Sequence, residues 1–169
     1  MRFLYLILIC ALFTSCWPSS MSFIDKGSMP PEWKIFFVQT LENTAPNTPL
    51  SYSATLSEAI KDGIQNSTQL SLGTSPEDAQ IELIGEIINY SITPIAMQEG
   101  DNAAQNRLSV SVKIDFFITA PEEDKMSMTT SRFIDYDSNT DLSQVESTLL
   151  EEVNVQIVQD VVNKLLSNW

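Results

Sequence analysis

Cys16 is the residue whose chemistry is best defined by its neighbours in the sequence. Arg2 is followed by an unbroken apolar run over residues 3–13, and Ser15 stands directly before the cysteine. A positive charge, an apolar run too short to cross a bilayer and a small residue before a cysteine are typical of a secretory signal with a lipidation site. We therefore expect cleavage that removes residues 1–15 and acylation of the Cys16 thiol. The alternatives are an ordinary export signal with a chance cysteine, or a buried N-terminal strand.

Two groups of carboxylates have spacings that acid–base or metal chemistry would use. Glu82 and Glu86 lie on one predicted strand, and residues 122–124 form an acidic cluster in a turn. The pair has no accompanying base, nucleophile or oxyanion donor, and the cluster lacks the spacing of an EF-hand. The chain also contains no histidine, the commonest general base and zinc ligand. We interpret both groups as solvent-facing and predict a protein that is not an enzyme and has no cofactor or metal.

Basic residues are rare enough to be informative, and three are expected on neighbouring strands: Arg107, Lys113 and Arg132. Together they could contact a phosphate or carboxylate group. They could equally pair across the strands with nearby aspartates, namely Asp115, Asp135 and Asp137. The residue types alone leave both interpretations open.

The charge balance excludes several classes of partner. The chain has 9 Lys and Arg against 22 Asp and Glu, a formal net charge of −13. Such an acidic surface argues against nucleic acid and against electrostatic docking on anionic membranes. Membrane attachment would therefore come from acyl chains, each of which contributes about 0.8 kcal/mol per buried methylene.

Hydrophobic periodicity predicts the elements that would position these residues. Apolar residues three or four apart indicate helices over residues 51–67 and 142–166, the second capped by Asp141. Apolar runs and alternation indicate strands, three of them unusually long, over 33–40, 80–96, 108–118 and 126–136. The order β-α-β-β-β-α predicts an α+β fold with two helices packed on one face of a mixed, mostly antiparallel four-stranded sheet.

Several short segments also occur in a characteristic order and spacing. They are residues 28–32, 56–62, 85–94, 106–110, 131–136 and 163–169. With the lipidation site at Cys16, their order resembles the LptE family of lipopolysaccharide-assembly lipoproteins over essentially the whole chain after the signal. The resemblance implies a signal peptide over 1–15, a lipidated tether over 16–27 and a single LptE-like domain over 28–169.

The resemblance also implies a role. It implies an outer-membrane lipoprotein, facing the periplasm, that assists assembly of and plugs the LptD β-barrel during lipopolysaccharide delivery. Members of the family contact lipopolysaccharide through basic residues on the sheet, for which Arg132 is the best positional match and Lys113 the next. The acidity of this chain would suit a barrel with a basic lumen. The alternative function is a periplasmic lipoprotein that binds a small apolar or glycan ligand between sheet and helices.

Overall fold

The computed structural model describes residues 29–95 and 104–167. Cys16, the predicted signal peptide and the tether lie outside these residues. The described chain forms two α-helices, a short 3₁₀ helix and six strands. In chain order these are β1 (Ile35–Val38), β2 (Glu42–Asn43), α2 (Tyr52–Ser67), β3 (Ser71–Leu72), η1 (Pro76–Asp78), β4 (Ile81–Ile95), β5 (Gln105–Ile118), β6 (Asp124–Asp137) and α3 (Leu142–Leu166).

The sheet is mixed, as predicted, but it has six strands instead of four, and the order along the chain is β-β-α-β-β-β-β-α instead of β-α-β-β-β-α. Its strands lie in the order β3-β1-β4-β5-β6, and β2 also pairs with β4. The pairings of β1 with β3 and of β1 and β2 with β4 are parallel, whereas β4, β5 and β6 are antiparallel. The prediction of four strands was wrong because β2 and β3 have two residues each, too few to show any periodicity.

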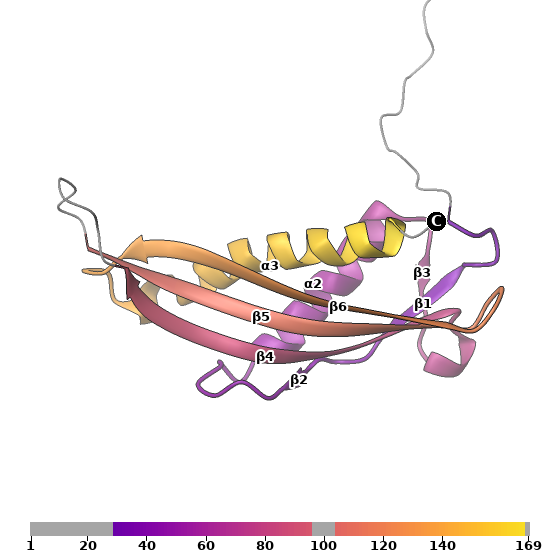
Figure 1. Cartoon of the computed structure of the whole chain (residues 1–169), viewed down its shortest axis with the longest axis horizontal. Coiled ribbons are helices and arrows are strands. Elements are labelled where there is room, and N and C mark those ends of the chain that lie inside the picture. The colour runs from indigo at the N-terminus through magenta and orange to yellow at the C-terminus, as the bar shows by residue number, and fades with distance from the viewer. Residues whose placement is uncertain (1–28, 96–103, 168–169) are drawn as a thin grey trace, which may run out of the picture.

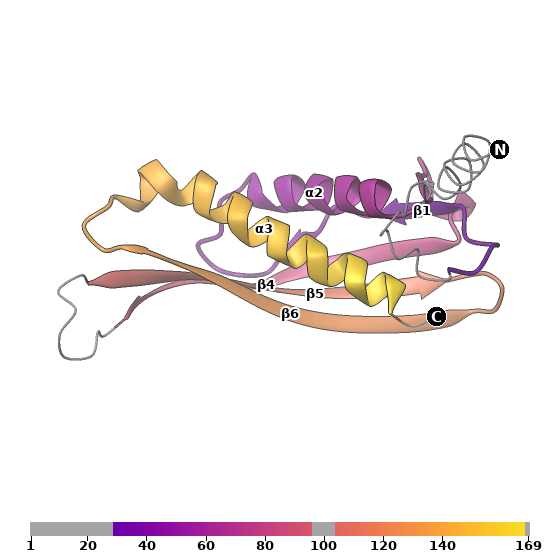
Figure 2. The ribbon, with the colours of Figure 1, turned by 90° about the horizontal axis from the view of Figure 1, so that it is seen from above.

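Three long strands dominate the fold, and their alternating sequence explains their two different faces. In β5, every second residue from Leu108 to Ile118 is buried, while the residues between them are partly or fully exposed. Successive side chains of a strand point to opposite faces, so one face of the β4–β5–β6 ladder is largely apolar, with Thr130 and Arg132 of β6 as polar exceptions. Helices α2 and α3 cover that face, and the ladder extends past both ends of α3 (Figure 1, Figure 2).

A register shift in β4 keeps the apolar face continuous. Ile81, Leu83 and Ile87 are buried before the shift, and Tyr90 is buried after it. The irregularity lies between Ile87 and Asn89, where one extra residue in β4 resets the alternation. Gly85 lies at a close approach between β4 and the segment before β2, since an added Cβ would lie 3.1 Å from Cγ of Leu41.

The two helices contact each other closely as well as packing on the sheet. Gly63 of α2 faces Val158 of α3, and a Cβ at position 63 would lie only 2.1 Å from Cγ1 of Val158. Further along the pair, the buried Tyr52 hydroxyl donates a hydrogen bond of 2.7 Å to Oδ1 of Asn154. Burial raises the pKa of Tyr52, so this hydroxyl keeps its proton and the bond. The helix layer therefore has a fixed geometry.

Helix α3 begins as the sequence predicts. The Asp141 carboxylate accepts hydrogen bonds from the backbone N–H of Ser143 at 3.0 Å and from its hydroxyl at 2.9 Å. The bond from the backbone amide, and to a lesser degree the one from the hydroxyl, holds the pKa of Asp141 below its usual value. Lys164 lies in the last turn, where a cation interacts favourably with the helix dipole.

Candidate functional site

The candidate site is the face of the ladder that neither helix covers, which we call the open face. Its centre is rich in hydroxyl groups, and the Ser111 and Ser131 side chains lie 2.7 Å apart in a cross-strand hydrogen bond. The open face is made by alternate residues of the three strands: Glu82, Ile84, Glu86, Asn89, Ser91, Arg107, Ser109, Ser111, Lys113, Asp115, Phe117, Lys125, Ser127, Thr129, Ser131, Phe133 and Asp135.

Arg107 lies on the open face in a bidentate ion pair. Its Nε and Nη2 donate to the two carboxylate oxygens of Asp135 at 2.7 and 2.8 Å. Its guanidinium also lies 3.7 Å from the centre of the Phe133 ring, half of which is exposed. Hydrogen bonding to Arg107 holds the pKa of Asp135 below its usual value. The result is a pre-positioned unit of a planar cation and an exposed aromatic ring, both accessible to a partner.

Lys113 lies on the same face with a looser pairing. Its ammonium is 3.8 Å from Oε1 of Glu86, and its side chain is 46% exposed, so its charge remains available to a ligand. A second lysine, Lys125, is 3.0 Å from Oδ2 of Asp115 and 4.6 Å from the centre of the Phe117 ring. The hollow beside Lys113 measures about 140 Å³, well below the roughly 300 Å³ at which small-molecule sites begin.

Arg132 lies on the other face of the sheet, apart from Arg107 and Lys113. Its Nε donates 2.7 Å to Oδ2 of Asp160 on α3, and its Nη2 donates to Oδ1 of the same carboxylate. Asp160 also accepts a hydrogen bond from the Thr130 hydroxyl. The three predicted basic residues therefore do not converge on one ligand. All three are ion-paired, although only Arg107 uses one of the aspartates that the sequence suggested.

The Asp160 carboxylate should make stability depend on pH. The hydrogen bonds from Arg132 and, to a lesser degree, from Thr130 hold the pKa of Asp160 below its usual value. A carboxyl with a lower pKa in the folded state stabilises the fold above its unfolded-state pKa of about 4, and this is lost as the pH falls through the folded-state value. We expect Asp160→Asn to lower the free energy of unfolding by about 1–2 kcal/mol at pH 7.

Urea unfolding at pH 7 and at pH 3 measures this effect. The difference between the parent and Asp160→Asn should shrink at pH 3, because this pH lies below the unfolded-state pKa and part of the stabilisation by the ionised carboxylate is then lost. Glu152→Gln is the control, since Glu152 is exposed on the same helix and forms no ion pair with a described residue. A deficit of Asp160→Asn that is as large at pH 3 as at pH 7 would show that the charge is not responsible.

The carboxylates that the sequence analysis singled out are exposed or lie on the open face. Glu82 and Glu86 lie on the open face, and Glu122, Glu123 and Asp124 are exposed in and beside the turn between β5 and β6. Within residues 29–95 and 104–167, no three acidic side chains are grouped as metal ligands. No helix in this described part has the length and apolar content needed to span a membrane.

Comparison with solved structures supports the fold. A hypothetical protein from Chlamydia trachomatis superimposes with a TM-score of 0.54 at 14% identity, over 80% of this chain and 99% of that one. A putative neuraminyllactose-binding hemagglutinin homologue from Helicobacter pylori gives 0.54 at 14%, covering 90% and 92%. An uncharacterized lipoprotein B from Nitrosomonas europaea gives 0.53 at 13%, covering 90% and 92%. At these identities the likeness concerns the fold alone.

Comparison with sequence families is more specific. No curated protein sequence matches the chain. The family model LptE, described as lipopolysaccharide-assembly, matches residues 34–165. The matched range runs from just before β1 almost to the end of α3, and it includes the whole open face. The chain therefore belongs to the LptE family of lipopolysaccharide-assembly proteins.

Proposed function

We propose that this protein is an outer-membrane lipoprotein, anchored through Cys16, that assists assembly of and plugs an LptD-like β-barrel during lipopolysaccharide delivery to the outer leaflet. As a member of the LptE family, the chain is a non-enzymatic lipoprotein with a role in lipopolysaccharide assembly. The barrel partner, the anchor and the outer-membrane location are the parts that we propose. The domain bounds 1–15, 16–27 and 28–169 belong to the same proposal.

The open face is the observation that supports this proposal most directly. It is a long surface whose backbone hydrogen bonds are made within the sheet, and most of its side chains are hydroxyls or charged groups, several of them ion-paired. The interior of a membrane β-barrel is polar and contains water. A surface with several of its charges already ion-paired can lie against such an interior with fewer unpaired charges to bury.

Two basic residues on the open face are the proposed contacts with the barrel or with lipopolysaccharide. Arg107 offers a planar cation beside the exposed Phe133 ring, and Lys113 offers an ammonium held only loosely by Glu86. Arg132, the family's best positional match, is 41% exposed beside Asp160 and would contact a partner from the helix side instead. The proposed contacts therefore lie on two faces of the molecule.

The alternative of a small-ligand site between sheet and helices has less support. Large side chains from α3 fill that layer, including Val153, Ile157, Val161 and Leu165, all of which are fully buried. A hollow of about 730 Å³ lies between the two helices instead.

A membrane pulldown with the tagged full-length protein tests the barrel proposal. We expect an LptD-like barrel to be recovered with the parent protein, and Ser131→Arg, which adds bulk to the open face, to reduce its recovery several-fold. Gln156→Arg adds the same side chain at an exposed position of α3 and should recover the barrel as the parent does. Equal recovery by both variants would show that the open face does not contact the barrel.

Two further arms of this experiment separate the anchor from charge matching. Cys16→Ala should abolish palmitate labelling and release the folded protein from the membrane fraction. Raising the salt concentration should weaken barrel recovery if a basic lumen matches the acidic chain, because salt screens exposed charges beyond about 10 Å at 0.1 M. Recovery that does not depend on salt would contradict charge matching while leaving the barrel partner in place.

A further inference from the structure

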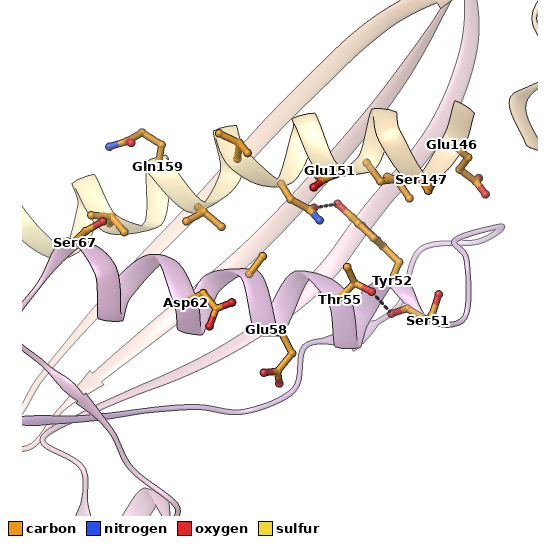
Figure 3. Close-up of a pocket in the computed structure, with 16 residues that line it drawn as sticks. Ser51, Tyr52, Thr55, Glu58, Asp62, Ser67, Glu146, Ser147, Glu151 and Gln159 are labelled. Carbon is orange, nitrogen blue, oxygen red and sulfur yellow. Dashed lines mark hydrogen bonds between the residues drawn. The ribbon is translucent and has the colours of Figure 1, made fainter. Parts of the chain in front are cut away.

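A groove runs between α2 and α3 on the outer side of the helix layer, away from the sheet. It encloses about 730 Å³ and is lined from residue 51 to residue 67 on one side and from 146 to 162 on the other. Figure 3 shows the lining side chains between the two helices, with the strands behind them. The groove is therefore bounded by two rigid elements, and nothing in the proposed function above uses it.

The floor of this groove is apolar and partly unprotected. It is formed by small and branched side chains, including Ala59, Leu150, Val158 and Val162. Val155, also in the groove, is 66% exposed. An exposed valine above partly buried apolar side chains, in a groove between helices, is typical of a surface that receives another apolar element.

The rim of the groove is acidic. Glu58 and Asp62 of α2 and Glu151 of α3 line it, and no lysine or arginine of the described chain does. Glu58 is paired with Lys61 at 2.8 Å, whereas no ion pair among the described residues involves Asp62 or Glu151. An apolar floor between unpaired carboxylates is complementary to an apolar stripe flanked by lysine or arginine.

The hydrogen bond between Tyr52 and Asn154 fixes one end of the groove. Both side chains line the groove and are almost fully buried, so the spacing of the helices there is set before any partner binds. A surface formed in advance loses little conformational freedom on binding, and this favours affinity. A second copy of the chain fits poorly, because two acidic rims would repel each other.

We propose that the groove between α2 and α3 binds a cationic amphipathic helix of a partner polypeptide. The apolar stripe of that helix would pack on Val155 and Val158, and its basic residues would lie beside Asp62 and Glu151. This is the helix-in-groove mode of recognition, in which apolar anchors three or four residues apart determine the fit. The inference does not depend on the barrel proposal.

A synthetic peptide of leucine and lysine tests this proposal with the full-length protein. About 14 residues, with leucine at helical spacing, form a helix of about 21 Å. Fluorescence anisotropy of the labelled peptide should show saturable binding. A scrambled peptide of the same composition and a leucine–glutamate peptide should bind at least about tenfold more weakly. Absence of saturable binding, or equal binding of the scrambled peptide, would overturn the proposal.

Matched variants locate the binding site. Asp62→Lys combined with Glu151→Lys should weaken binding by about tenfold. Glu122→Lys combined with Glu123→Lys changes the net charge equally in an exposed turn outside the groove lining and should change binding less than about twofold. Equal losses in the two double variants would show general attraction to an acidic protein and would overturn the assignment to the groove.

A third variant tests the floor without changing charge. Ala59→Trp fills the groove and should abolish saturable binding, whereas Gln156→Trp, exposed on α3 outside the groove lining, should not. Circular dichroism and urea unfolding confirm that both variants are folded. Unchanged peptide binding by a folded Ala59→Trp protein would overturn the proposal. A parent protein that dimerises, with a dimer that Ala59→Trp dissociates, would overturn it too, since the occupant of the groove would then be a second copy.

Discussion

Phe116→Ala is expected to lower the free energy of unfolding by about 3–5 kcal/mol, the largest effect of any substitution considered for this protein. The ring is fully buried on the covered face of β5, within the core that α2 and α3 close. Removing it both loses the transfer free energy of the aromatic group and leaves a cavity that surrounding side chains fill only in part. Urea unfolding followed by circular dichroism measures the difference.

Phe117→Ala is the matched control, one residue further along the same strand. Phe117 lies on the open face, where Lys125 packs 4.6 Å from its ring centre. Its loss removes partial burial and one exposed cation–π contact, so we expect a decrease below about 1.5 kcal/mol. Similar losses for both phenylalanines would contradict the assignment of β5 to one covered and one open face.

Gly63→Ala should destabilise the protein, although the same change in most helices is stabilising. Alanine is favoured over glycine in a helix interior by about 1 kcal/mol. Here the new methyl group would lie 2.1 Å from Cγ1 of Val158, so α2 and α3 must separate or Val158 must leave its preferred rotamer. We expect a net decrease of about 1–2 kcal/mol in the free energy of unfolding.

A double-mutant cycle with Val158→Ala identifies the cause. In the Val158→Ala background the space for the methyl group exists, so Gly63→Ala should become neutral or stabilising by up to about 1 kcal/mol. The coupling energy between the two positions should then be about 2 kcal/mol. Gly63→Ala that destabilises equally in both backgrounds would place the conflict elsewhere.

The regular elements were largely readable from the sequence because their periods are strong. The alternation in β5 and the three-to-four spacing in α3 each extend over many residues, and both predicted elements are confirmed within a few residues of their ends. β2 and β3 were missed because each exists only through its pairing partner. Their formation depends on where β1 and β4 lie in space. A segment of two residues is too short to predict such a pairing from the sequence.

The placement of Arg132 shows a different kind of limit. The face of the sheet on which it lies could be predicted, because the apolar residues Met126 and Tyr136 lie an even number of residues away in the same strand. That signal places Arg132 on the covered face. Its partner Asp160, twenty-eight residues along the chain on α3, was not readable, since the pairing depends on how α3 crosses β6. Sequence periodicity assigns faces, whereas long-range partners follow from tertiary packing.

Because alternate residues of β5 serve the two faces, the strand can diverge at one set of positions while the other stays constant. Substitutions at Ser109, Ser111 or Lys113 alter what the exterior presents without touching the packing of Val110 or Val112 beneath the helices. Affinity for a new binding partner can therefore be selected at every second position with almost no loss of stability. Solved structures that share this fold at 13–14% identity show how far sequences can differ while the architecture is kept.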